Sequence, residues 1–368
     1  MTIKTSFFVL FLTLNTCVLF AQNQTIKTYY DEQKLAVKEI IEQQNGVNSG
    51  PYLLYYEGGS LAVKGTYVNG KREGVFIDFF PDTKDTLRIT TYRNDKKEGV
   101  SKSFFENGKP SQEVTYQSNQ IEGELITFYE NGEIHRKATF SNNTPDGITE
   151  IFDEEGILIE KKSYQNGVLE GLQESYHPNS QIQKTSNYRK GQINGEVLTY
   201  NESGKLRSKI NFKNGYQHGS FEEYYENGQI AKQGKYRNGD PDGEFKSFFS
   251  NGKTQEITKY KRGLPIGTFI SYYENGQIQE KIIHDKYYEI TMIIAYHENG
   301  KVQKEMNFEF GNQHGMTYVY FPSGQLKEEL PYQRGKVHGV QKVYSENGEI
   351  IMERFFTEGK ATGLREPK

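Results

Sequence analysis

The residues best suited to form a binding surface are aromatic, and they recur at fixed places in a block of about 24 residues. In the block that opens with Gly219, the fifth residue after the glycine is Tyr224 and the sixth is Tyr225. The fifth position is aromatic in all thirteen blocks between Gly50 and Gly363. Because successive side chains of a strand point to opposite faces, we expect the fifth position to face the core and the sixth to face outward. The predicted binding row is Tyr56, Phe80, Phe105, Tyr129, Tyr225, Phe249, Tyr273 and Phe321.

Two interpretations of this aromatic row stay open at the level of sequence. Exposed apolar patches commonly mark partner surfaces, and here two aromatic stretches flank a polar middle at Asp153, His177 and Asn201. Alternatively, the rings pack against lysines and cross-strand neighbours and serve stability alone. The chain has no Trp, so a Trp-built cage for a cationic ligand is excluded.

A second row of polar residues stands directly before the block glycines. Its members are Glu73, Glu98, Glu122, Asp146, Glu170, Asn194, His218, Asp242, His314 and His338. A ladder of carboxylates could attract divalent cations, and the histidines could add sensitivity to pH. Hard cations need several converging oxygens rather than a line, so solvated turn positions are the simpler interpretation and no metal site is predicted.

Catalytic chemistry finds little support in this sequence. The nucleophile elbow, the zinc-protease motif, the phosphate-binding loop and the dinucleotide fingerprint are all absent. The glutamates recur in turns, as at Glu226 and Glu274, which does not suggest one tuned acid–base pair. Net charge is −3 with both signs interspersed, which disfavours a nucleic-acid partner. We expect a non-enzymatic protein without a cofactor.

The elements that position these side chains are short strands joined by glycine turns. Asn227-Gly228 separates two runs of β-forming residues, which is a strong hairpin signal because a type I′ turn needs positive φ at both central residues. A second turn at Asn238-Gly239 leads to the next block, and such breaks come too often for a packed helix. The sequence predicts an all-β fold: an elongated, twisted antiparallel sheet of thirteen hairpins over residues 50–363.

The pattern resembles the MORN-type repeat in its bacterial variant form. The resemblance is carried by Tyr224-Tyr225-Glu226-Asn227-Gly228, by the closing Asn238-Gly239 with Gly243, and by similar copies at Tyr272-Tyr273-Glu274-Asn275-Gly276 and Phe128-Tyr129-Glu130-Asn131-Gly132. It implies an array of antiparallel hairpins that serves as a scaffold or binding surface. Many bacterial members are labelled antitoxin-like, and some eukaryotic members are linked to membranes or lipids, so a membrane surface stays a possible partner.

The N-terminal 49 residues differ from the array. Residues 1–21 are typical of a secretory signal peptide, with Lys4 before an apolar run that ends at Ala21. A lipoprotein using Cys17, the single cysteine, is an alternative, and so is a buried N-terminal element. Residues 22–49 are predicted to form a helical cap around a helix at 31–44, and residues 364–368 a short tail.

These features together predict an exported, non-enzymatic repeat scaffold that binds a protein or cell-surface partner through its sheet face. After cleavage of the signal peptide it would reside in the periplasm, on the outer surface or outside the cell. One alternative is an antitoxin-like protein-binding role inside the cell, and another is an envelope spacer without a specific ligand. The oligomeric state is left open.

Overall fold

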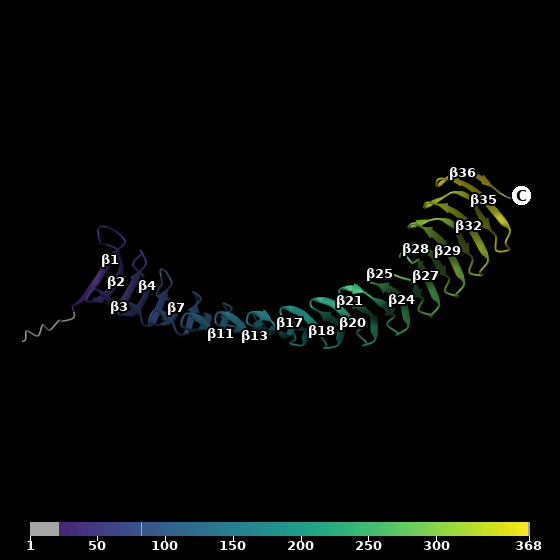
Figure 1. The fold of residues 1–368 in the computed structure, drawn as a ribbon. Coiled ribbons are helices and arrows are strands. Elements are labelled where there is room, and N and C mark those ends of the chain that lie inside the picture. The colour runs from purple at the N-terminus through teal and green to yellow at the C-terminus, as the bar shows by residue number, and fades with distance from the viewer. Residues whose placement is uncertain (1–21, 82, 367–368) are drawn as a thin grey trace, which may run out of the picture. The chain divides into compact units, whose positions relative to one another are not determined.

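The structure is a computed structural model that describes residues 22–81 and 83–366 (Figure 1). Within that part the chain is entirely β, with 36 strands, no helix, and antiparallel pairing between sequence neighbours. The all-β antiparallel fold predicted from the sequence is therefore confirmed. The chain divides into two compact units, residues 1–144 and 145–368, which are described separately.

The first unit is a ladder of hairpins. Its strands are β1 (Asn23–Tyr29), β2 (Val37–Gln44), β3 (Val47–Tyr55), β4 (Leu61–Val68), β5 (Lys71–Arg72), β6 (Gly74–Phe79), β7 (Thr86–Arg93), β8 (Lys96–Lys97), β9 (Gly99–Phe104), β10 (Pro110–Gln117), β11 (Gln120–Phe128) and β12 (Ile134–Ser141).

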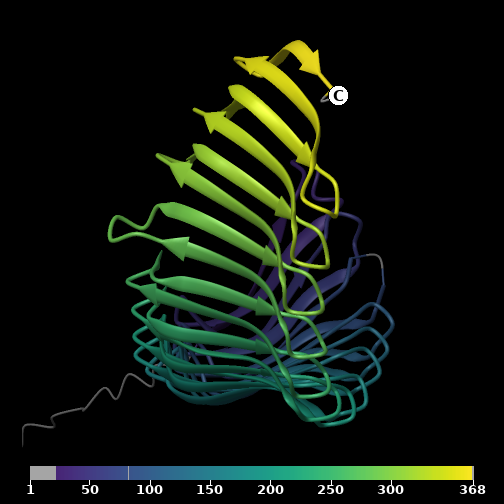
Figure 2. The same ribbon diagram turned by 90° about the vertical axis from the view of Figure 1, so that its right-hand side faces the viewer.

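The second unit repeats the same arrangement, and Figure 2 shows its strands stacked edge to edge from green to yellow. Its strands are β13 (Thr144–Phe152), β14 (Leu158–Gln165), β15 (Val168–Leu169), β16 (Gly171–Tyr176), β17 (Ile182–Arg189), β18 (Gln192–Tyr200), β19 (Leu206–Lys213), β20 (Tyr216–Tyr224), β21 (Ile230–Arg237), β22 (Asp240–Pro241), β23 (Gly243–Phe248), β24 (Thr254–Lys261), β25 (Leu264–Pro265), β26 (Thr268–Tyr272), β27 (Ile278–His284), β28 (Ile290–Tyr296), β29 (Val302–Glu309), β30 (Asn312–Gln313), β31 (Gly315–Tyr320), β32 (Leu326–Gln333), β33 (Lys336–Val337), β34 (Gly339–Tyr344), β35 (Ile350–Thr357) and β36 (Lys360–Arg365).

Two kinds of turn alternate along each ladder. The hairpin turn between β20 and β21 closes with Tyr225 N–H donating to the carbonyl of Gln229 and Gly228 N–H donating to that of Tyr225, both over 2.9 Å. The connector turn before the next hairpin has φ of 53° at Asn238 and 94° at Gly239. Only glycine and, less readily, asparagine adopt such left-handed angles at little cost, which explains why the sequence spaces these residues so regularly.

The buried row lies at the second position of a block rather than at the predicted fifth position. In β20 the pairing with β21 shifts register between Glu223 and Tyr224. The ring of Tyr224 lies beyond this shift, and its hydroxyl donates to Glu222, on the face opposite to Phe221. The fifth-position rings are half-buried, whereas Phe221 at the second position is 6% exposed. The expectation that the fifth position fills the core therefore differs from the structure.

The packed core of each ladder consists of the second residue of a block and the residue that faces it across the hairpin. Phe221 faces Gly234 on β21, and the Phe245 ring of the following hairpin covers this glycine. A Cβ placed at Gly234 would lie 2.4 Å from that ring, and one at Gly65 would lie 2.5 Å from Phe76. Two glycines that fall outside the turn positions are thus required by close packing rather than by φ.

The predicted helix at 31–44 is wrong. Residues 23–44 form a hairpin instead, in which Ile26 of β1 faces Ile41 of β2, and Ile41 is 5% exposed. β2 also pairs with β3, so its backbone groups are satisfied in the sheet. The apolar spacing of β2 fits a strand as well as a helix, and pairing to both neighbours decides between them. The cap of the array is therefore a further hairpin.

Two further predictions concern the ends of the chain. The proposed signal peptide at 1–21 lies outside the described residues. At the other end β36 extends beyond the predicted array, since Leu364 pairs with Arg354 and Arg365 with Glu353. No helix in residues 22–81 and 83–366 has the length and hydropathy needed to cross a membrane.

Candidate binding face

The eight aromatic residues predicted to bind lie at the start of the hairpin turns, on what we call the turn edge. Each donates its backbone N–H to a carbonyl on the far side of its own turn, as Tyr56 does to Ser60 and Phe249 does to Lys253, both over 2.8 Å. All eight are half-buried rather than exposed. The structure brings Phe249 and Tyr273 together in one shallow hollow of about 400 Å³. The others occupy the equivalent place in separate hairpins.

The tyrosine hydroxyls of the turn edge bond to the following hairpin. Tyr56 donates to the carbonyl of Phe79 over 2.8 Å, and Tyr225 donates to that of Phe248 over 2.6 Å. Tyr273 makes the same bond to Tyr296 over 2.8 Å. These bonds link successive repeats, so the geometry of the row fits the stabilising interpretation. A binding role for these eight residues stays a prediction.

Other polar side chains at the turns are engaged in the same way. Asn227 accepts from Gln229 N–H over 3.0 Å within its own turn and donates through Nδ2 to the carbonyl of Ser250 over 2.9 Å. Lys253 Nζ donates to the carbonyl of Glu274 over 2.8 Å. The turn edge is thus a continuous set of contacts from one repeat to the next.

The row of carboxylates before the block glycines has a similar structural role at the connector turns. Glu73 accepts from Asn94 N–H over 2.8 Å, and Glu170 accepts from Lys190 N–H over 2.7 Å. Each carboxylate therefore satisfies a backbone donor in the next connector. Among the described residues, no cluster of three His, Cys, Asp or Glu side chains could hold a metal ion.

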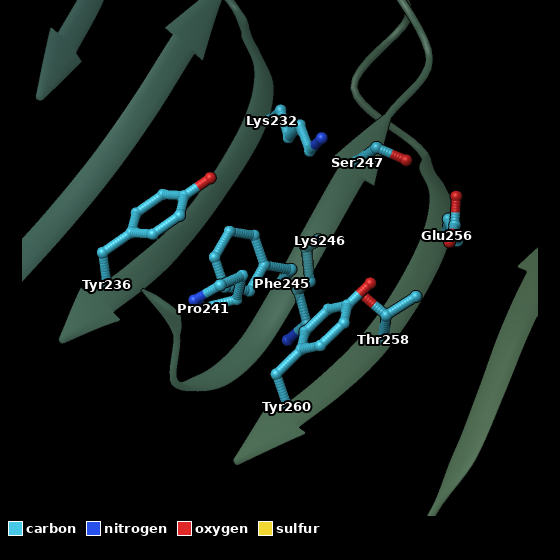
Figure 3. Close-up of a pocket in the computed structure, with 9 residues that line it drawn as sticks. All are labelled: Lys232, Tyr236, Pro241, Phe245, Lys246, Ser247, Glu256, Thr258 and Tyr260. Atoms are coloured by element: carbon cyan, nitrogen blue, oxygen red, sulfur yellow. The ribbon is translucent and has the colours of Figure 1, made fainter. Parts of the chain in front are cut away.

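A different surface carries free polar groups, and we call it the groove face. It is the face of the second unit that bears the side chains of Lys232, Tyr236, Ser247, Glu256 and Tyr260, which line an open hollow of about 350 Å³. Figure 3 shows the rings of Tyr236 and Tyr260 on either side of Phe245, with Lys232, Ser247 and Glu256 toward the opposite end of the strands. Sequence reasoning missed this site.

The rings of this hollow form a packed aromatic platform. The centroid of Phe245 lies 5.3 Å from that of Tyr236 and 5.5 Å from that of Tyr260, with interplanar angles of 86° and 84°. Edge-to-face pairs of this kind fix ring orientation. Burial raises the pKa of Tyr236, with smaller contributions from Glu223 and Tyr260, so its hydroxyl stays protonated at neutral pH. The platform therefore presents apolar rings, with a neutral hydroxyl at Tyr236.

The polar side of the hollow is not used by the fold. Within residues 22–81 and 83–366, the side chains of Lys232, Ser247 and Glu256 make no hydrogen bond or ion pair with another residue. The hydroxyls of Tyr236 and Tyr260 likewise have no partner there. These groups are available to a ligand, in contrast to the tyrosines of the turn edge.

Similar hollows occur in other hairpins of the second unit because the repeat places equivalent residues in register. One hollow of about 290 Å³ is lined by Ser175, Lys184 and Tyr188, and another of about 210 Å³ by Ser271 and Glu280. Strand pairing joins the polar positions into one row: Glu160, Ser175, Lys184, Thr199, Ser208, Glu223, Lys232, Ser247, Glu256, Ser271 and Glu280. A sequence signal existed, because these residues recur at the fourth and thirteenth positions of successive blocks.

The repeats match a known family in twelve segments. The MORN repeat variant model covers residues 49–69, 97–118, 121–142, 145–166, 169–190, 193–214, 217–238, 241–262, 265–286, 294–309, 313–334 and 337–358. The chain belongs to the MORN repeat variant family. The matches number one fewer than the thirteen predicted repeats, and the block without a match begins at Gly74, although β6 and β7 pair there as a hairpin.

Comparison with whole proteins adds little to the MORN assignment. No curated protein matches the chain. A crystal structure of TcdB2-TccC3-Cdc42 aligns with a TM-score of 0.17 and 10% identity, covering 94% of this chain and 22% of that one. The Tc holotoxin pore of Photorhabdus luminescens aligns with a TM-score of 0.16 and 11% identity, again covering 94% and 22%. The chain spans about a fifth of the length of these proteins, and the likeness is too weak to bear on its function.

Proposed function

We propose that this MORN-repeat scaffold is a non-enzymatic, exported protein that binds an extended protein or cell-surface partner through the groove face. The observation that supports the proposal most is the set of polar side chains without partners among the described residues, at Lys232, Ser247 and Glu256, beside the aromatic platform of Tyr236 and Tyr260. Many weak, repeated contacts give useful affinity only to a partner that spans several repeats. The polar groups lie in a line rather than around one point, which suits binding better than catalysis.

Export is the part of the proposal that rests on residues 1–21 alone. Their charged start and apolar run are typical of a secretory signal. N-terminal sequencing of the mature protein tests it, and cleavage near Ala21 is expected. An intact Met1 on a soluble cytosolic product would contradict export and favour the antitoxin-like role.

Site-specific crosslinking tests the binding proposal. A photo-crosslinking residue at Ser247 should capture one defined partner in intact cells, because this position has no intramolecular contact to lose. The same residue at Gln233, next to Lys232 on the opposite face of the sheet, is the control. Equal capture at both positions would contradict the groove face as the binding surface. No adduct at any position along the face would favour an envelope spacer.

A further inference from the structure

We propose that the groove face binds a neutral, β-1,4-linked glycan that lies along the array, across the strands. This inference rests on the proposed binding function and names the chemistry of the partner. Tyr236 and Tyr260 occupy equivalent places on β21 and β24, with β23 between them. Two strand spacings are roughly 10 Å, so one platform tyrosine is offered at about that interval. A disaccharide step of an extended β-1,4-linked glycan has a similar length.

The two sides of the hollow match the two kinds of surface on a sugar ring. A pyranose has an apolar face of C–H groups, which packs on aromatic rings, and a rim of hydroxyls, which both donate and accept hydrogen bonds. The rings of Tyr236 and Tyr260, each packed edge-to-face on the buried ring of Phe245, supply the first contact. Ser247 and Lys232 can donate to hydroxyl oxygens, and Glu256 can accept from hydroxyl protons, without giving up any bond of the fold.

Charge along the polar row favours a neutral polymer over a charged one. From Glu160 to Glu280 the row holds four glutamates and two lysines among serines and threonines, and Glu160 is paired with Lys162 beside the row. A polyanion such as a nucleic acid needs a basic stripe, and this row is mildly acidic. An extended polypeptide would repeat every two residues, or roughly 7 Å, which does not match the interval between platform tyrosines.

Recurrence of the hollow predicts dependence on ligand length. The hollow at Phe245 and the one at Phe269 belong to successive hairpins and share Glu256. A glycan long enough to fill both gains the second set of contacts as an intramolecular event. We therefore expect a hexasaccharide to bind at least about tenfold more tightly than a disaccharide of the same sugar.

The experiment is calorimetric titration of the full chain with cello-oligosaccharides and chito-oligosaccharides of two to six sugars. Binding that tightens with length in either series supports the proposal, and the two series show which β-1,4-linked sugar is preferred. Lys232→Ala combined with Glu256→Ala should weaken the hexasaccharide about tenfold or more, as expected for lost hydrogen bonds to a ligand. Tyr236→Ser with Tyr260→Ser should abolish detectable binding.

Gln233→Ala provides the matched control, since it adjoins Lys232 on the opposite face. Its affinity should equal that of the parent chain, and melting curves should show that the Lys232 and Glu256 variant is folded. No heat with either series, equal affinity for all lengths, or stronger binding of a polyanion or an extended peptide would overturn the proposal. If crosslinking in cells captured a protein on the groove face and no glycan bound in calorimetry, the glycan proposal would be wrong. The proposed binding function would still stand.

Discussion

The turn edge and the groove face are built by the same repeat, but they use their polar atoms in opposite ways. At the turn edge, Tyr225 and Asn227 bond to backbone carbonyls of the next hairpin. On the groove face, Ser247 and Glu256 have no partner within the described part of the chain. The polar character of a residue alone therefore does not separate residues that hold the array together from residues free to bind. The contacts that each side chain makes do separate them.

Stability should be most sensitive to substitution of Gly234, which lies under the Phe245 ring at the floor of the groove face. Gly234→Ala places a Cβ against the Phe245 ring, where the separation would be 2.4 Å, so the ring or the strand must move. Overpacking of this kind typically costs about 1–3 kcal/mol of unfolding free energy, which denaturant unfolding of the full chain measures.

The matched control for that change is its combination with Phe245→Leu, which makes the ring position smaller. If the contact causes the loss, the double variant should be less destabilised than the sum of the two single changes. If the destabilisation of the double variant equalled the sum of the two single changes, the Phe245 ring would not be the reason that a glycine is needed at Gly234.

The turn edge should respond more modestly than the floor. Tyr225→Phe removes the hydroxyl that donates to Phe248 over 2.6 Å while it keeps the ring. The expected loss is about 1 kcal/mol of unfolding free energy, as for one hydrogen bond. Ser247→Ala on the groove face is the control and should change stability by less than about 0.5 kcal/mol. Equal losses from the two changes would remove the distinction between the two surfaces.

Alkaline pH should reveal the hydroxyls that are engaged in hydrogen bonds within the fold. The hydrogen bond to Glu222, with burial second, raises the pKa of Tyr224 to about 12. An unfolded tyrosine titrates near 10, so its contribution to stability is present below about pH 10 and is lost as pH rises toward 12. Tyr224→Phe should flatten this decline in melting experiments between pH 9 and 12, roughly the interval set by the two pKa values. An unchanged decline would show that other groups cause it.

The sequence was sufficient to predict the hairpins but not the surface that carries polar side chains without intramolecular partners. Asn-Gly turns and phased glycines need particular φ angles, so they could be recognised without the fold. The helix at 31–44 failed because an eight-residue apolar pattern fits both periods, although Asn45-Gly46 repeats the signal of Asn69-Gly70 one block later.

The core row was misassigned for a different physical reason. The regular aromatic at the fifth position was taken as the core residue, whereas the buried ring is Phe221 at the second position. Alternation from Phe221 places Tyr224 on the opposite face with Glu222, where its hydroxyl bonds. Among the described residues, Ser247 and Glu256 lack hydrogen-bond partners because of the residues that lie on the neighbouring strands. The sequence of a single block does not contain those neighbours.

The bonds from one hairpin to the next have a consequence for how such a chain can change in evolution. Each hairpin offers its successor the same set of donors and acceptors, as Asn227 does to Ser250 and Asn275 does to Glu298. If one complete block were duplicated or lost, each junction between hairpins would still be formed by the same hydrogen bonds. The array can then gain or lose whole hairpins while the hydrogen bonds at each existing junction stay the same.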